Sequence, residues 1–354
     1  MVKNVENIIV GISVGDLNGI GSEVILKSFE DARMFEFCTP VIFANSKLFS
    51  YLKKVLDVNV VINSIDKLDQ IVPNKLNVLN VWREGVNIEF GALDTNVGKY
   101  AIKSFKSATE ALSNGLIDVL VTAPINKNNI QSEDFSFPGH TDFLNQELQG
   151  EALMFMVNNN LRVGLITDHV AINDINSLIT PDVIKSKVKT IYKSLKVDFK
   201  IAMPKIAILG LNPHCGDGGV IGDEDDKIIR PVILDLFDEG YKVFGPYSAD
   251  GFFGSSEYEK YDAVVAMYHD QGLIPFKTLS FGSGVNFTAG LDKVRTSPDH
   301  GTAFAIAGKG IADFSSFVEA VYLAIDIYRN RMEYQELTQN TLRIQNNQIF
   351  KKEY

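Results

Sequence analysis

Three histidines follow apolar runs that are typical of buried strands. They are His169 after LRVGLIT, His214 after KIAILGL and His269 after DAVVAMY. In an open α/β sheet, ligands bind outside the carboxyl ends of the strands, and neutral imidazole is the commonest protein metal ligand. Any one histidine is more often structural, but three in the same position predict a catalytic metal site with one open coordination position. Asp270 could orient the ring of His269.

Other polar residues could bind an anion. His140 and Thr141 follow a Pro-Gly pair and precede a helical pattern, so an imidazole, a hydroxyl and free helix N–H groups come together there. Thr141 could equally be no more than a helix N-cap. Further along, Lys277, Asn286 and Arg295 bring an ammonium, an amide and a guanidinium into one stretch. Such groups hold a carboxylate or phosphate through charge-assisted hydrogen bonds.

Two glycine-containing loops could bind phosphates or a nucleotide. GDLNGIGSE, at 15–23, follows an expected strand and precedes an expected helix, as a phosphate cradle would. It matches neither G-x-G-x-x-G nor G-x-x-x-x-G-K-S/T, so a tight strand–helix connection is an equal alternative. SPDHGTAFAIAGKGIAD, at 297–313, combines Asp299 and His300 with a Gly-Thr turn. A loop of this kind could grip a nucleotide through its backbone.

Apolar strand patterns alternate with amphipathic helical patterns along the chain, which predicts an α/β fold. We expect strands at 7–16, 41–44, 58–62, 76–81, 118–122, 153–157, 162–167, 206–211, 243–244 and 263–268. We expect helices at 23–33, 47–56, 96–114, 142–148, 181–195, 225–239 and 315–333. Thr180 should cap the helix that begins at Pro181. A hairpin turn is expected at 158–160, and the polar stretch 335–354 should be peripheral.

Bulk properties limit the classes of protein that fit. A chain of 354 residues exceeds the usual size of a single core, so two domains are expected. The net charge of −10, from 34 basic and 44 acidic residues, disfavours a general nucleic-acid or membrane surface. Two cysteines, Cys38 and Cys215, indicate a reducing compartment rather than a disulfide framework. With no signal-peptide pattern or long apolar run, we expect a cytoplasmic protein.

Several of these segments together resemble a known family. In chain order, and spanning residues 15–310, they are GDLNGIGSE, TAPINK, GHTDFL, DHVAINDI, GLNPHCGDGGVIGDE, GPYSADGFF, YHDQG, GVNFTAGL and RTSPDHGTAFAIAGKG. The chain is thereby similar to the 4-hydroxythreonine-4-phosphate dehydrogenase family of pyridoxal phosphate biosynthesis. Departures from the family pattern fall at Leu17, Asn18, Ser22, Cys215, Asp217, Ser248 and Gly251. None removes a metal or substrate position.

The resemblance implies an α/β protein with the isocitrate/isopropylmalate dehydrogenase-like fold, in which two α/β/α domains enclose a cleft. Residues 1–125 plus 275–354 would form a discontinuous nucleotide-side domain, and 126–274 the metal and dimerisation domain. The family forms a homodimer with shared active sites, so the site residues need not all converge within one chain. The loop at 297–313 resembles the nucleotide-binding loop of isopropylmalate dehydrogenases, which implies NAD, with NADP as an alternative.

The resemblance also implies roles for individual residues. The ligands of one divalent metal, zinc, magnesium or cobalt, would be His169, His214 and His269. Substrate contacts would fall on His140, Thr141, Lys277, Asn286 and Arg295. The proton acceptor would be one of Asp250, Asp270 and Lys277, and cofactor contacts would fall on Asp299, His300, Gly301, Thr302 and Gly308.

The implied reaction is the NAD-dependent oxidation of 4-phosphooxy-L-threonine to 2-amino-3-oxo-4-(phosphooxy)butanoate, which then decarboxylates to 3-amino-2-oxopropyl phosphate. Two alternatives stay open on the residues alone. One is a paralogous dehydrogenase of 4-phosphorylated threonate or erythronate. The other is a metal hydrolase or lyase in which three histidines hold a metal-bound water without a nicotinamide.

Overall fold

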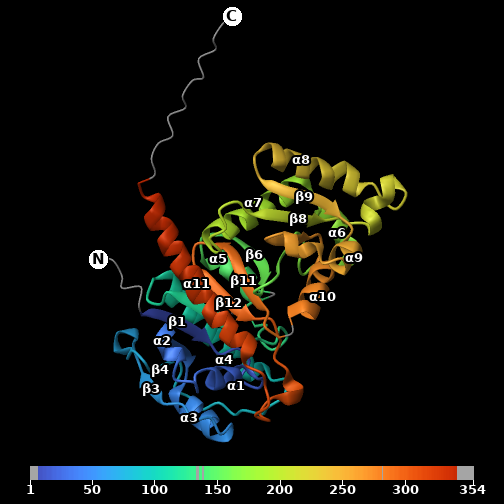
Figure 1. Ribbon diagram of the computed structural model, residues 1–354. Coiled ribbons are helices and arrows are strands. Elements are labelled where there is room, and N and C mark those ends of the chain that lie inside the picture. Colours follow the sequence, from blue (N-terminus) through green and yellow to red (C-terminus); the bar gives the residue numbers. More distant parts are fainter. Residues whose placement is uncertain (1–6, 133–134, 138, 281, 341–354) are drawn as a thin grey trace, which may run out of the picture.

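The computed structural model describes residues 7–132, 135–137, 139–280 and 282–340. Within them, twelve strands form one twisted sheet with helices packed on it (Figure 1). The strand order is β3-β4-β2-β1-β5-β12-β11-β6-β7-β10-β8-β9. In chain order the strands are β1 (Ile8–Ser13), β2 (Cys38–Ala44), β3 (Ile62–Ile65), β4 (Leu76–Asn80), β5 (Val119–Thr122), β6 (Gly150–Val157), β7 (Arg162–Leu165), β8 (Lys205–Leu209), β9 (Lys242–Tyr247), β10 (Ala263–Ala266), β11 (Val285–Leu291) and β12 (Val294–Pro298).

The sheet contains two parallel runs of opposite direction. Strands β3, β4, β2, β1, β5 and β12 run parallel to one another. Strands β7, β10, β8 and β9 form the second parallel run. Between the two runs, β12 pairs antiparallel with β11, β11 with β6 and β6 with β7. Three reversals separate the runs, so their carboxyl ends lie at opposite edges of the hydrogen-bonded ladder.

The helices that complete the fold are α1 (Gly21–Ser28), α2 (Met34–Phe37), α3 (Ser46–Val55), α4 (Thr95–Ser113), α5 (His140–Glu147), α6 (Ile172–Leu178), α7 (Pro181–Val197), α8 (Arg230–Asp238), α9 (Ala249–Gly254), α10 (His269–Ser280) and α11 (Ser315–Thr338). Helices α4 and α11 cover opposite faces of the sheet. Leu120 of β5 packs in one apolar cluster with Phe105 of α4, whereas Val121 packs in another with Phe317 of α11. This alternation follows from the two-residue period of a strand.

Most expected elements are confirmed. The hairpin at 158–160 joins the antiparallel pair β6 and β7. Thr180 caps α7, where its side chain accepts a hydrogen bond from the Val183 N–H. The expectation for 225–239 needs one refinement, because its first turn is the π-helical η3 (Asp225–Ile229), which leads directly into α8.

Several expected boundaries are wrong by two residues or more, and the four largest differences or those nearest the site are the following. The strand expected at 58–62 is β3, which begins only at Ile62, where pairing with β4 starts; Val58 and Val60 are core residues outside any strand. The helix expected at 23–33 ends at Ser28, and α2 follows as a separate short helix. Helix α5 begins at His140 with Gly139 as its N-cap, so Thr141 is not the cap. Helix α11 extends to Thr338, and 341–354 lie outside the described residues.

The α/β fold class is confirmed by this architecture, and the division into two domains stays a prediction. In the described part of the chain, no helix combines the length and apolar character needed to cross a bilayer.

Candidate active site

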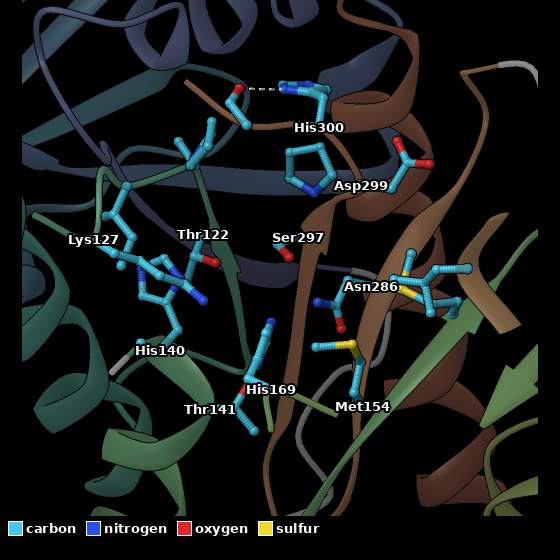
Figure 2. A pocket seen from close by; sticks show the side chains of 18 of the residues that line it. Thr122, Lys127, His140, Thr141, Met154, His169, Asn286, Ser297, Asp299 and His300 are labelled. Atoms are coloured by element: carbon cyan, nitrogen blue, oxygen red, sulfur yellow. Dashed lines mark hydrogen bonds between the residues drawn. The ribbon is translucent and has the colours of Figure 1, made fainter. Parts of the chain in front are cut away.

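A cavity of about 250 Å³ lies where loops from both parallel runs meet over the middle strands of the sheet (Figure 2). From the first run come Thr122 and the turn after β5, together with the end of β12. From the second come His169 after β7 and His269 after β10. The remaining lining residues include Lys127, Gly139, His140, Thr141, Asp142, Met154, Met156, Leu273, Lys277, Asn286, Arg295, Ser297, Asp299, His300 and Gly301.

Arg295 is a buried cation at the inner wall of this cavity. It lies on β12 and is 2% exposed. Its guanidinium donates to the hydroxyls of Thr122 and Thr288 on the two neighbouring strands, at 2.6 and 3.1 Å. No described carboxylate lies within ion-pair distance of it, and burial lowers the pKa of its guanidinium to about 9. A buried charge without a counterion is costly, so this position favours an anionic ligand.

His140 presents a hydrogen-bond donor to the same space. Its Nδ1 lies 3.1 Å from the Arg295 Nη2. A guanidinium only donates, so Nδ1 is the acceptor and a neutral ring carries its proton on Nε2. Burial, then Arg295, then Lys127 lower the pKa of His140 well below its usual value, which keeps the ring neutral. Nε2 is buried and finds no partner among the described residues, so this N–H is available to a ligand.

The start of α5 adds further donors. Its N-cap, Gly139, makes no side-chain capping hydrogen bond. The first-turn N–H groups of a helix lack intrahelical partners and carry partial positive charge. Opposite, on β11, the buried Oδ1 of Asn286 has no partner within the described residues. The expected substrate residues His140, Thr141, Lys277, Asn286 and Arg295 thus all line one cavity.

The three strand-end histidines are only partly brought together. Strands β7, β10 and β8 are adjacent and parallel, as the sequence pattern requires for a shared edge. The rings of His169 and His269 lie 5.5 Å apart between centroids. His214 lies outside the cavity lining, in η2 (Pro213–Gly219), where its φ is 53°. Among the described residues, no three His, Cys, Asp or Glu side chains are grouped closely enough to hold a metal ion.

The two adjacent imidazoles are suited to metal ligation by their chemistry. Nδ1 of His269 lies 2.7 Å from a carboxylate oxygen of Asp270, which leaves Nε2 for another partner. Carboxylates commonly orient metal-binding histidines in this way. Burial, then the charge of Lys127, lower the pKa of His169, so its ring is neutral and able to donate a lone pair at neutral pH. One chain therefore offers two imidazole ligands, His169 and His269, that are chemically suited to a divalent metal.

The three expected proton acceptors differ in position. Lys277 lines the cavity, and its ammonium donates to the Asp299 carbonyl at 2.7 Å. Asp270 lies outside the lining, and its carboxylate is hydrogen-bonded to His269, which does line the cavity. Asp250 accepts from the Ser248 hydroxyl at 2.6 Å and also lies outside the lining; this hydrogen bond, then that of the Gly251 N–H, and to a smaller extent the charge of His214, lower the pKa of its carboxyl.

The expected cofactor residues divide in the same way. Asp299, His300 and Gly301 line the cavity, and Nε2 of His300 is buried without a described partner. Thr302 instead joins the loop to the glycine turn after β1, where its carbonyl accepts from the Ile20 N–H at 3.0 Å. Gly308 has φ 73° and packs on Phe90, where a Cβ would lie 2.3 Å from the ring. These two positions shape the loop rather than face the cavity.

The glycine turn at 15–23 does not line the cavity. A Cβ on Gly19 would lie 2.8 Å from the Thr302 carbonyl oxygen, so the turn is a tight packing element. Asp16 is fully buried there and accepts hydrogen bonds from the Asn18 N–H and the Asn129 side-chain amide, at 3.0 and 2.9 Å. Burial raises the pKa of its carboxyl above the usual value. Asp16 therefore anchors the turn after β5, and the structural alternative for these glycines holds.

Helix α4 packs closely against the same turn, and Gly98 is the residue at the point of contact. A Cβ at Gly98 would lie 1.9 Å from the Asn129 carbonyl oxygen, a backbone atom that cannot swing aside. Gly98→Ala is therefore expected to lower the free energy of unfolding by about 3 kcal/mol, as overpacking does. Urea denaturation measures this change in the free energy of unfolding. Gly254→Ala in α9, where a Cβ meets nothing within 4 Å, is the matched control and should be nearly neutral. Equal effects of the two substitutions would contradict the packing role.

Sequence reasoning missed several lining residues. Met154 and Met156 form an apolar wall on β6, and their pattern indicates only a core strand. Lys127 follows β5 by five residues, within TAPINK, and was assigned no role. Its position after a strand end was the available signal.

The fold and the cavity define an α/β protein with a pocket suited to a small anionic ligand beside a pair of imidazoles. The model of the family described as "Pyridoxal phosphate biosynthetic protein PdxA" matches residues 36–324, and the chain belongs to this family. It is 47% identical, over 95% of its length and 93% of the relative's, to 4-hydroxythreonine-4-phosphate dehydrogenase of Bacteroides thetaiotaomicron. The family expected from the motifs is therefore confirmed.

Two further comparisons bear on fold and substrate. The solved structure of 4-hydroxythreonine-4-phosphate dehydrogenase from Klebsiella pneumoniae superimposes with a TM-score of 0.77 at 31% identity, covering 91% of this chain and 99% of that one. A protein of Oceanobacillus iheyensis named "Putative D-threonate 4-phosphate dehydrogenase" is 35% identical over 90% of this chain and 97% of its own length.

Proposed function

We propose that this chain is an oxidoreductase that converts 4-phosphooxy-L-threonine to 2-amino-3-oxo-4-(phosphooxy)butanoate, with NAD or NADP as oxidant, in pyridoxine 5'-phosphate biosynthesis in the cytoplasm. The observation that carries the proposal is one cavity with two chemically different ends. At one end are Arg295, the Nε2–H of His140 and the start of α5, which suit a phosphate. At the other are the neighbouring rings of His169 and His269.

The reaction requires that the substrate be held across these two ends. With its phosphate against Arg295 and His140, a four-carbon substrate places its secondary hydroxyl towards His169 and His269. The Oδ1 of Asn286, which has no described partner, is available to the ammonium of the substrate. Fixing both ends in this way sets the orientation of the carbon that reacts, which is a large part of catalysis.

A divalent metal, zinc, magnesium or cobalt, would be held by His169 and His269, with His214 as the third ligand. When bound, such an ion supplies Lewis acidity that lowers the pKa of an alcohol. When bound, the nicotinamide would accept the hydride of the carbinol carbon, and the hydroxyl proton would go to a base of the protein. The candidate bases are Asp250, Asp270 and Lys277; Lys277 lines the cavity and could take the proton only as its neutral amine. In the resulting β-keto acid, the bond to the carboxylate breaks, carbon dioxide leaves, and a proton adds to the α-carbon to give 3-amino-2-oxopropyl phosphate.

The nicotinamide side is proposed to be the loop that begins at Asp299. Its residues Asp299, His300 and Gly301 line the cavity next to Lys277, so a cofactor held there meets the reacting carbon from the β12 side. The protein's contribution is this placement, since the hydride chemistry belongs to the cofactor.

Purified protein tests the proposal. It should be assayed with NAD and with NADP on 4-phosphooxy-L-threonine, D-threonate 4-phosphate and D-erythronate 4-phosphate, with each metal and with a chelator. We expect reduced nicotinamide and carbon dioxide from the first substrate. Reduction with D-threonate 4-phosphate alone would instead support the activity named for the Oceanobacillus relative. No reduction with any substrate would favour a metal hydrolase or lyase.

We also propose that the site is shared in a homodimer. Apolar side chains are exposed on the segments that follow the three strand-end histidines: Ile172 is 84% exposed, Val220 83% and Ile274 63%. Exposed apolar side chains gathered near a site indicate an interaction surface. A second copy seated there would cover them, and His214 lies on this same side, outside the cavity of its own chain.

Charges placed on this surface should break the dimer. In a two-fold interface each substitution is present on both subunits, so the double substitution Ile172→Asp and Val220→Asp buries four added charges. We expect at least ~100-fold weaker dimerisation. Sedimentation or light scattering over a concentration series measures it. Val61→Asp, an equally apolar position beside the outermost strand β3 and 70% exposed, is the control and should leave the mass unchanged. A double variant that remains dimeric would place the interface elsewhere.

A further inference from the structure

Lys127 lines the cavity and belongs to none of the residue sets expected from the sequence. It lies in the turn after β5, and its side chain extends beside His140 (Figure 2). The stem contacts the N-cap of α5, since a Cβ on Gly139 would lie 4.0 Å from the Lys127 Cε. A lysine that is exposed to solvent usually has no binding role, so a role for Lys127 has to be argued from the groups that surround its ammonium.

Those surroundings are unfavourable for a cation. The ammonium lies near the start of α5, where the helix dipole and unpaired N–H groups repel positive charge. The buried guanidinium of Arg295 lines the same cavity, and burial, then Arg295, then the charge of Lys127 lower the pKa of His140. Asp142 also lines the cavity, but no described carboxylate lies within ion-pair distance of Lys127. Positive charge gathered without a counterion calls for an anion between the groups.

The backbone that carries Lys127 is fixed on both sides. Asn126 forms an Asx turn in which its side-chain oxygen accepts from the N–H groups of Asn128 and Asn129, at 3.0 and 3.1 Å. The amide of Asn129 is in turn held by buried Asp16 at 2.9 Å. Gln131 donates to the Lys127 carbonyl at 3.3 Å. A side chain delivered by so constrained a turn is preorganised for a ligand.

We propose that Lys127 binds the phosphate of the substrate from the cavity mouth, opposite Arg295, and sets the preference for phosphorylated over unphosphorylated substrates. The inference rests on the proposed function for the identity of the substrate. A dianionic phosphate has three oxygens and can accept from Lys127, Arg295 and His140 at once, whereas a lone carboxylate has two.

The test compares Lys127→Met with wild type on 4-phosphooxy-L-threonine and on unphosphorylated 4-hydroxy-L-threonine. A charge-assisted hydrogen bond is worth roughly a 10- to 150-fold change in affinity. We therefore expect KM for the phosphorylated substrate to rise by about 50-fold, with kcat changed less than about 3-fold. The unphosphorylated substrate should be unaffected. Lys127→Arg should restore most of the affinity. The control is Lys54→Met on the exposed face of α3, which removes one positive charge away from the cavity and should leave KM unchanged.

A second readout does not need turnover. Inorganic phosphate should raise the Tm of the wild type and of Lys54→Met, but not that of Lys127→Met, because only a bound ligand stabilises the fold. Lys127→Gln repeats both measurements if the Met variant has lost its circular-dichroism spectrum. Unchanged KM and an unchanged phosphate response would overturn the proposal, as would equal losses on both substrates, which would indicate a structural role. A wild type that oxidises neither substrate yet responds to phosphate through Lys127 would reject the proposed reaction and keep the phosphate site.

Discussion

Replacing His269 with alanine is expected to reduce turnover by at least ~10³-fold, and to leave the purified protein with a small fraction of the divalent metal of the wild type, because a catalytic metal site has only three protein ligands. The ring of His269 lies next to that of His169 and is oriented by Asp270, so removing it leaves only one imidazole of this pair. Metal content by elemental analysis and the rate of nicotinamide reduction measure the two effects.

Two further variants make this prediction sharper. Asp270→Asn keeps the ligand but loses the carboxylate that orients it, so metal affinity should fall by roughly 10- to 100-fold. His214→Ala tests the third expected ligand, which does not lie beside His169 and His269 within one chain. If the dimer completes the site, this variant should lose metal and turnover as fully as His269→Ala. A His214→Ala enzyme with normal metal content and rate would remove His214 from the metal site.

Replacing Arg295 with methionine is expected to lower kcat/KM for the phosphorylated substrate by roughly 10²–10³-fold, because truncating one partner of a buried charge pair costs about 2–5 kcal/mol. The fold should tolerate the change. Burial lowers the pKa of Arg295, so its charged form is disfavoured in the folded state, a cost present below that lowered pKa and relieved as the pH rises above it. Losing this cost offsets the lost hydrogen bonds to Thr122 and Thr288.

Arg295→Lys is the informative companion. It keeps a positive charge, but its three donors share one nitrogen, whereas Arg295 reaches the two threonines and His140 Nδ1 from two separate nitrogens, so the contact that fixes the tautomer of His140 should be weakened. We expect an intermediate loss of kcat/KM. Unfolding free energies from urea titration should remain within about 2 kcal/mol of wild type for both variants. If Arg295→Met retains wild-type kcat/KM while folded, the anion lies elsewhere in the cavity.

The chemistry of the site was largely predictable from local sequence. Polar residues placed after apolar runs had to fall at strand ends, and β7, β10 and β8 do lie side by side and parallel, each followed by a histidine. The substrate residues expected from the family resemblance share one cavity. Boundaries were less predictable where burial and strand pairing diverge. Val58 and Val60 are buried like strand residues, yet hydrogen-bond pairing begins only at Ile62.

The sequence by itself determined which polar side chains lie at the ends of strands, because an apolar run and the polar residue that follows it are local properties of the chain. Only the tertiary structure decided that the two parallel runs point in opposite directions and that their loops nevertheless meet over β11 and β6. It also decided that Asp16 anchors a turn instead of facing the ligand, and that Lys127 lies against the start of α5. No local pattern encodes such contacts: Asp16 and Asn129 are 113 residues apart in the chain, and Lys127 meets the N-cap of α5 only because the chain turns back on itself.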